Sequence, residues 1–168
     1  MNAINASINL SSLYINQGRY PEAEELLLHS CTVLKSMKEE EAEASYITSL
    51  NSLALVQEAL ARYEEAEINL REVREFDRER YGEKHPYFAT TLSNLGSLYL
   101  DMGLFPKAEQ LFLNGLEILK SDEENRFAYA ISLNNLGNAY RYMDEVTKAI
   151  PLYQQALVIL KEKAGEPG

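Results

Sequence analysis

Apolar residues recur at helical spacing through a segment near the middle of the chain, which serves as the reference for the rest. Leu92, Leu95 and Tyr99 follow the i, i+3, i+7 spacing of a helix with one apolar face. Gly103 can end that helix in the left-handed conformation, and Pro106 suits the first turn of a second helix that follows at once. The segment therefore predicts two helices joined by a tight turn.

Three other segments repeat this pattern along the chain. Tyr20, Tyr63, Phe105 and Val146 mark the same phase in the four copies, so the spacing between copies is 43, 42 and 41 residues. A near-constant period of this length predicts stacked helical hairpins, because each hairpin can bury its apolar face only against its neighbours.

The copies depart from one another at a few positions. In the second copy Gln57 replaces the tyrosine and Ala61 replaces the glycine, and in the fourth copy Asp144 occupies the glycine position. In the first copy Leu10 and Leu13 align with packing leucines of the reference segment, so we expect them to pack as well. These departures weaken the regularity of the second repeat without changing the predicted fold.

We therefore expect an all-α fold, a right-handed α-solenoid of four helix-turn-helix hairpins with about eight helices. The chain is predicted to be a single array, with repeats at about 1–43, 44–84, 85–124 and 125–163. Both ends look cut, so we expect a piece of a longer array. On the last helix an apolar stripe through Tyr153, Leu157 and Leu160 would be covered by a neighbouring molecule or left exposed.

These residues carry a family resemblance. The pattern L-x-x-L-G-x-x-Y from Leu92 to Tyr99, followed by Ala108 and Phe112, resembles the tetratricopeptide repeat. The long period and the junction YGEKHPYFA, residues 81–89, are similar to the kinesin light chain-like subclass. The resemblance implies a solenoid that binds proteins, as an adaptor or as a regulatory arm, and it leaves the partner open.

Charge and composition restrict the partners. The 168 residues carry a net charge of −10, which argues against binding to nucleic acid or to an anionic membrane, because both need clustered Lys and Arg. Cys31 is the single cysteine and cannot form an internal disulfide. With no signal peptide or membrane-spanning run in the sequence, we expect a cytoplasmic protein.

Residues suited to catalysis or metal binding are sparse. Two histidines and one cysteine cannot supply a zinc site, and the sequence has no phosphate-binding glycine loop or nucleophile elbow. His85 precedes Pro86 and is expected to cap a helix, while His29 lies among leucines. We therefore expect no enzymatic activity, no cofactor and no metal.

The polar positions of each hairpin's first helix are the candidate binding site. They are mostly Asn, Ser and Thr, although helix surfaces usually favour Ala, Glu, Lys or Arg. An asparagine amide offers both a donor and an acceptor to the backbone of an extended peptide. The predicted peptide-binding groove comprises Asn9, Ser12, Asn16, Asn51, Ser93, Asn94, Ser97, Asn134, Asn135, Asn138, Arg141 and Tyr142. The alternative is that these side chains form an unused, solvated surface or hydrogen-bond to the adjacent helix.

A polar seam interrupts the second repeat. Asn69, Arg74 and Asp77 stand where the other copies carry mainly leucine. Arg74 and Asp77 are three residues apart and could form an ion pair along the helix. The alternative hypothesis is a hinge between the first two and the last two repeats, or a contact site for another domain.

The sequence thus predicts a protein–protein interaction module that binds a peptide or protein segment in an Asn/Ser-rich concave groove. An alternative is the sensing arm of a larger enzyme, because bacterial arrays resembling this subclass are often fused to caspase-like proteases or signalling nucleotide hydrolases. A third hypothesis is end-to-end self-association through exposed terminal helices.

Overall fold

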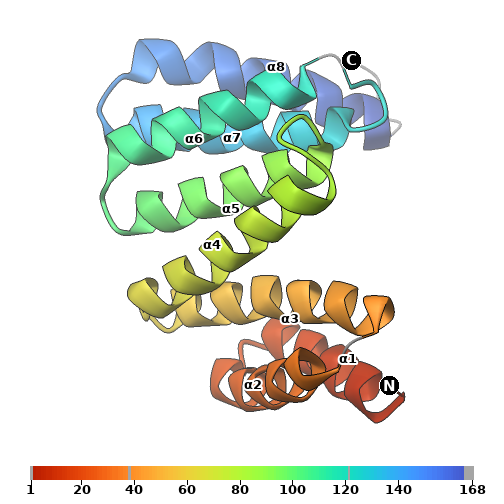
Figure 1. Cartoon of the computed structure of the whole chain (residues 1–168). Coiled ribbons are helices and arrows are strands. Elements are labelled where there is room, and N and C mark those ends of the chain that lie inside the picture. Colours follow the sequence, from red (N-terminus) through yellow and green to blue (C-terminus); the bar gives the residue numbers. More distant parts are fainter. Residues whose placement is uncertain (1, 38, 121, 165–168) are drawn as a thin grey trace. The chain divides into compact units, whose positions relative to one another are not determined.

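The structure, a computed structural model, describes residues 2–37, 39–120 and 122–164, which form eight α-helices and no strand (Figure 1). The helices are α1 (Asn2–Asn16), α2 (Tyr20–Ser36), α3 (Glu40–Ala59), α4 (Tyr63–Arg80), α5 (Pro86–Asp101), α6 (Phe105–Leu119), α7 (Arg126–Tyr142) and α8 (Val146–Ala164). The all-α fold of helical hairpins predicted from the sequence is confirmed.

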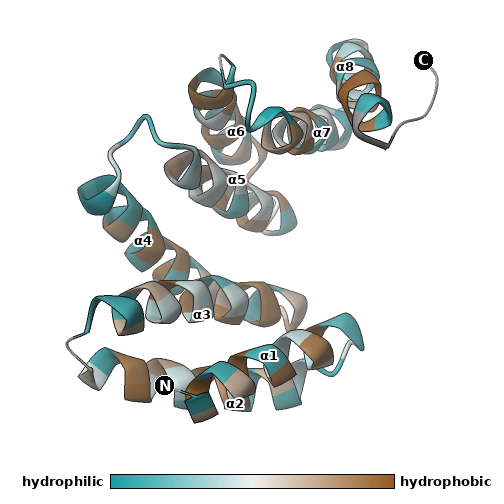
Figure 2. Cartoon of the chain, turned by 90° about the vertical axis from the view of Figure 1, so that its right-hand side faces the viewer, coloured by the Kyte–Doolittle hydropathy of each residue, from teal (hydrophilic) through white to brown (hydrophobic). Residues whose placement is uncertain are grey.

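Helices pack against one another within hairpins and between some neighbouring hairpins. Contacts join α1 to α2, α5 to α6 and α7 to α8 within hairpins, and α1 to α3 and α5 to α7 between hairpins. Each helix mixes apolar and polar residues around its axis (Figure 2). The contacts between first helices place the polar positions of α1 next to those of α3, and the polar positions of α5 next to those of α7.

The turn within each hairpin has the same geometry in all four copies. Gly18, Ala61, Gly103 and Asp144 all have left-handed backbones, with φ of 71°, 58°, 73° and 61°. In each copy the amide of the next residue donates to the carbonyl five residues back, as in the bond of 2.8 Å from Leu104 N to Tyr99 O. The helices therefore end in a Schellman-type turn whether or not the sequence supplies glycine.

The chain divides into two compact units, residues 1–76 and 77–168. In the first unit, Leu27 of α2 packs with Leu50, Leu53 and Val56 of α3, and all four side chains are almost fully buried. Cys31 borders this core, where burial raises the pKa of its thiol to about 11. The thiol is therefore protonated and poorly nucleophilic at neutral pH.

In the second unit, aromatic rings fill the space left by glycines. Phe112 is completely buried, and a Cβ added to Gly96 would lie 2.6 Å from its ring. Gly137 stands in the same relation to Tyr153, with a distance of 2.7 Å. The glycine of the repeated L-x-x-L-G motif is therefore required for close approach of the two helices in each of these hairpins.

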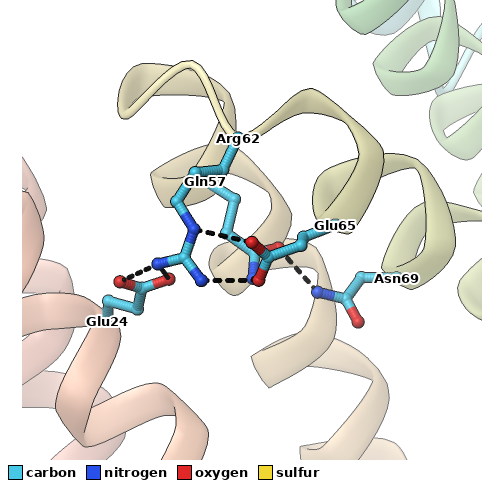
Figure 3. Close-up of polar contacts among 5 residues, drawn as sticks. All are labelled: Glu24, Gln57, Arg62, Glu65 and Asn69. Atoms are coloured by element: carbon cyan, nitrogen blue, oxygen red, sulfur yellow. Dashed lines mark hydrogen bonds and ion pairs between the residues drawn. The ribbon is translucent and has the colours of Figure 1, made fainter.

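The second hairpin contains a polar cluster around Gln57, the residue that stands in place of the repeat tyrosine (Figure 3). Gln57 is 2% exposed, and its carbonyl accepts a hydrogen bond of 2.7 Å from Asn69 Nδ2. Arg62 binds both Glu65 and the two carboxylate oxygens of Glu24 on α2, the latter at 2.6 and 2.7 Å. The polar side chains of this cluster therefore form hydrogen bonds and ion pairs with one another.

The prediction of an ion pair between Arg74 and Asp77 is wrong, because each side chain contacts a different residue. The Arg74 guanidinium contacts Glu75, whereas the buried Asp77 carboxylate accepts a hydrogen bond of 2.6 Å from the Thr91 hydroxyl. Burial raises the pKa of Asp77, and the Thr91 bond and the nearby His85 offset part of that effect. The hinge at this seam stays a prediction.

Leu10 and Leu13 also differ from the expectation. They are 40% and 51% exposed, although their counterparts Leu95 and Leu98 are almost completely buried. Alignment alone assigned the packing role, whereas the structure has no described residue covering this side of α1.

Candidate peptide-binding site

Two neighbouring polar stripes make up the candidate site of the second unit. The stripes follow the i, i+4, i+7, i+11 spacing of a single helix face and remain exposed or half-buried. We name them together the α5/α7 face; it comprises Thr90, Asn94, Ser97 and Asp101 of α5 and Ile131, Asn135, Asn138 and Tyr142 of α7. Most of these side chains are neutral hydrogen-bonding groups.

Ser93 does not belong to this face, which corrects its assignment to the predicted groove. It is only 6% exposed, and its hydroxyl lies 2.9 Å from that of Ser132, which is also buried. This contact lies between α5 and α7, so a ligand on the surface would not reach Ser93. Asn134 occupies the equivalent position on α7 and is exposed.

The amide of Asn138 is oriented by a neighbouring helix. The Tyr153 hydroxyl, on α8, donates to Asn138 Oδ1 at 2.9 Å. Because this bond uses the side-chain carbonyl, the amide NH2 is the group best placed to serve a ligand, as a donor. Asn135, one helical turn earlier, is half-buried on the same stripe.

One end of the α5/α7 face carries an aromatic stack. The rings of Tyr142 and Phe105 are nearly parallel, with centroids 5.9 Å apart, and the Arg141 guanidinium lies 4.6 Å from the centre of the Tyr142 ring. Tyr142 remains largely exposed. The structure thus brings the predicted residues Arg141 and Tyr142 together and adds Phe105, which sequence reasoning assigned only to the repeat phase.

The first unit carries a corresponding α1/α3 face. Asn9, with Asn5 and Thr48, lines a hollow of about 240 Å³ between α1 and α3. Ser12 and Asn16 continue the stripe along α1 and are exposed. Asn51 of α3 is half-buried and occupies the repeat position of Ser93, so it does not belong to this stripe.

Leu55 interrupts the polarity of the α1/α3 face. It is 53% exposed at the position that Ser97 and Asn138 occupy in later copies. The sequence search missed Leu55 because it looked only for polar residues.

Charge is scarce on α1, α5 and α7, whereas α3 carries Glu40, Glu41, Glu43 and Glu58. No residue of α1 is charged, α5 has only Asp101 at its last position, and α7 has only Arg126 and Arg141. By contrast, α4 reads YEEAEINLREVREFDRER. The negative charge of the protein therefore lies mainly outside the α5/α7 face.

The two histidines, the side chains best suited to acid–base chemistry or metal binding, lie in structural or exposed positions. His85 caps α5 as predicted, since its Nδ1 accepts a hydrogen bond of 3.2 Å from the Tyr87 amide, and its ring packs against Tyr81 and Tyr87. His29 is exposed on α2. Across the described residues, no three His, Cys, Asp or Glu side chains are grouped to hold a metal ion. No helix in that part of the chain has the length and apolarity needed to cross a bilayer.

Models of known families match most of the chain. One tetratricopeptide repeat model matches residues 45–121 and 87–162, and a second matches residues 5–36. No curated protein matches the sequence significantly.

Solved structures share the fold at low sequence identity. BtubC (BKLC) from P. vanneervenii is 24% identical with a TM-score of 0.78, over 98% of this chain and 66% of BtubC. The "Podosopora anserina putative kinesin light chain nearly identical TPR-like repeats" are 22% identical with a TM-score of 0.77, over 96% of this chain and 76% of that one. RapI is 17% identical with a TM-score of 0.74, over 95% of this chain and 43% of RapI.

Proposed function

Because the chain belongs to the tetratricopeptide repeat family, with repeats of the kinesin light chain-like type, we propose that it is a non-catalytic binding module that holds an extended, uncharged peptide segment on its α5/α7 face. Repeats of this family generally mediate protein–protein interaction. The observation that carries the proposal is the group of Asn, Ser and Thr side chains on two adjacent helices, namely Thr90, Asn94 and Ser97 of α5 and Asn135 and Asn138 of α7.

Hydrogen bonding to the peptide backbone is the proposed mode of recognition. Asn135 can pair with both the C=O and the N–H of an extended segment, whereas Asn138, whose carbonyl already accepts from Tyr153, would donate to a peptide carbonyl. Ser97, on the neighbouring helix α5, can act as donor or acceptor. Such pairing recognises main chain and so tolerates different peptide sequences.

The lack of charge on the face supports an uncharged ligand. A peptide carboxylate placed over the Asn and Ser side chains would lose hydration without gaining an ionic partner, and the one charged member of the face, Asp101, lies at the end of α5. Arg141 is occupied with the Tyr142 ring and stands alone, so a cluster of basic side chains that could hold a C-terminal carboxylate is lacking on the described part of this face. Binding should therefore depend weakly on ionic strength.

The aromatic stack supplies an anchor at one end of the face. Tyr142 and Phe105 offer flat apolar surface beside the Arg141 guanidinium. A proline or aromatic side chain of the peptide would fit there, since stacking buries apolar area at low entropic cost.

We also propose that the module acts in the cytoplasm, where its single buried thiol would persist.

A peptide-display selection on the wild-type chain tests the proposal. Selected peptides should lack Asp, Glu, Lys and Arg in their core, and their affinity should change less than about threefold between 50 and 500 mM NaCl. The variant Asn94→Ala, Asn135→Ala, Asn138→Ala should bind them at least about tenfold more weakly, since each neutral hydrogen bond contributes about 1 kcal/mol.

The matched control is Asn114→Ala, which removes an exposed amide from α6, away from the stripe. It should bind like wild type. Selection of strongly charged peptides, or equal binding by the triple variant and the control, would refute peptide capture on the α5/α7 face.

A further inference from the structure

We propose that a second copy of this chain docks head to tail, with an aliphatic strip on α8 of one molecule packing on an aliphatic strip on α1 of the next. The α8 strip comprises Val146, Ile150 and Leu157, and the α1 strip comprises Ala6, Leu10 and Leu13. This self-association lies outside the peptide-binding function proposed above and uses different residues.

The α8 strip occupies positions that, in earlier repeats, contact the repeat that follows. Phe105 corresponds to Val146 and stacks on Tyr142 of α7. Glu109 corresponds to Ile150 and accepts a hydrogen bond of 2.7 Å from the Tyr140 hydroxyl, also on α7. In the first unit the same position is Glu24, which binds Arg62 of the next repeat. These positions therefore form the forward face of a repeat.

On α8 this forward face is aliphatic and exposed. Val146 and Ile150 are each 49% exposed and Leu157 is 53% exposed, whereas Leu116, the counterpart of Leu157, is 8% exposed in the core shared by α6 and α7. Isoleucine at position 150 replaces the glutamate found in all three earlier repeats, so this face requires no polar partner. The expected exposure of an apolar stripe on the last helix is thus found at Leu157, with Tyr153 and Leu160 only partly exposed.

The α1 strip is the matching backward face. Ala6, Leu10 and Leu13 are all exposed. Their counterparts are buried in every later copy: Ser49, Leu53 and Val56 in α3; Thr91, Leu95 and Leu98 in α5; Ser132, Leu136 and Ala139 in α7. In α3 and α7 these positions pack against the preceding hairpin, a neighbour that α1 lacks among the described residues.

One chain therefore carries both halves of a repeat junction, and this favours a second copy as the occupant. Both strips are aliphatic and free of charge, so they can pack without burying an unpaired polar group. Because the two strips differ, the contact is heterologous and can build an open chain or a ring. Each copy has a net charge of −10, so added salt should strengthen the association by screening repulsion.

Light scattering and sedimentation of the 168-residue chain test the proposal. The weight-average mass of the wild type should rise above the 19.1 kDa of one chain as concentration increases. Leu13→Glu removes only the backward face and Ile150→Glu removes only the forward face, and each should raise the dissociation constant at least about tenfold. An equimolar mixture of the two variants should recover dimers and nothing larger, because each variant keeps one intact strip.

Val158→Glu is the matched control on α8. Val158 is as exposed as the strip residues, but its counterpart Glu117 already points to solvent, so this variant should associate like wild type. Circular dichroism should show the same helix content for all three variants. A wild-type chain that stays monomeric at all concentrations overturns the proposal, and so does a variant mixture that stays monomeric. Loss of association in Ile150→Glu alone would instead indicate a symmetric contact between α8 helices and would also overturn it.

Discussion

Replacing Ala61 by glycine should stabilise the protein. Ala61 has φ of 58° in a turn where Gly18 and Gly103 have φ of 71° and 73°. The left-handed conformation costs an L-residue about 1–2 kcal/mol because its Cβ approaches the following carbonyl oxygen. Glycine avoids this cost but loses about 0.5–1 kcal/mol more conformational entropy on folding. The net gain expected for Ala61→Gly is therefore about 0.5–1 kcal/mol.

The other copies of the turn provide the reverse test. A Cβ added at Gly103 would meet no atom within 4 Å, so Gly103→Ala changes the backbone energy and little else. It should destabilise the protein by about 1 kcal/mol. Asp144→Gly should gain less than Ala61→Gly, because aspartate tolerates the left-handed region better than alanine does.

Urea titrations followed by circular dichroism measure these differences. The midpoint should rise for Ala61→Gly and fall for Gly103→Ala at an unchanged slope, and the melting temperature should shift by about 2–4 °C for each kcal/mol. Separate transitions for the two units would call for fitting each one by itself. A lower midpoint for Ala61→Gly, or no change for Gly103→Ala, would refute the assignment of turn strain.

Three further predictions each concern one residue or one hydrogen bond. Burial raises the pKa of Asp77 above its ordinary value of 3.8, so the folded state holds this proton more tightly and loses stability as the pH rises from 3.8 through the folded-state pKa. Asp77→Asn, which keeps an oxygen for the Thr91 hydroxyl, should therefore raise the unfolding free energy at pH 7 and change it little at pH 3, as measured by urea titration at both values. Pro151→Gln, which gives α8 the residue found at this position in α6, should raise the unfolding free energy by about 1–3 kcal/mol in the same assay, because proline lacks the amide that α8 needs there. Asn69→Leu should destabilise the protein by about 1–3 kcal/mol by leaving the buried Gln57 carbonyl unpaired, and adding Gln57→Leu should restore part of the loss in a double-mutant cycle.

The helices could be predicted from the sequence because their packing is local and repeated. The apolar pattern, repeated in four copies, predicts the helical hairpins. Gly103 and Pro106 predict where the turn between two helices begins and ends, and the structure confirms that turn. The sequence could not show that Ala61 and Asp144 adopt the same left-handed turn, because alanine disfavours this conformation and aspartate only tolerates it. The tertiary arrangement imposes that conformation on them.

Contacts between residues distant in sequence were the harder part. Arg62 reaches Glu24 on another hairpin, and no spacing rule connects positions that far apart. The ion pair expected between Arg74 and Asp77 relied on such a rule, and each side chain found a different partner. Helical spacing identifies residues that can meet, whereas the environment of each residue determines which contact forms.

The candidate site illustrates the same limit at the scale of one residue. Ser93 and Asn94 are neighbours with similar polarity, and sequence reasoning placed both in the groove because neither belongs to the hairpin's apolar set. The structure separates them, since the helical rotation of about 100° per residue turns Ser93 toward Ser132 of the next first helix and Asn94 toward the stripe of the α5/α7 face. A polar residue outside the apolar set can thus serve either packing between repeats or binding. Comparing the same position across copies distinguishes the two roles: Ser93 is buried where a following helix covers it, and Asn134 is exposed at the equivalent place on α7. The residues that stay accessible in every copy, such as Ser12, Ser97 and Asn138, are therefore the ones on which a test of peptide binding should concentrate.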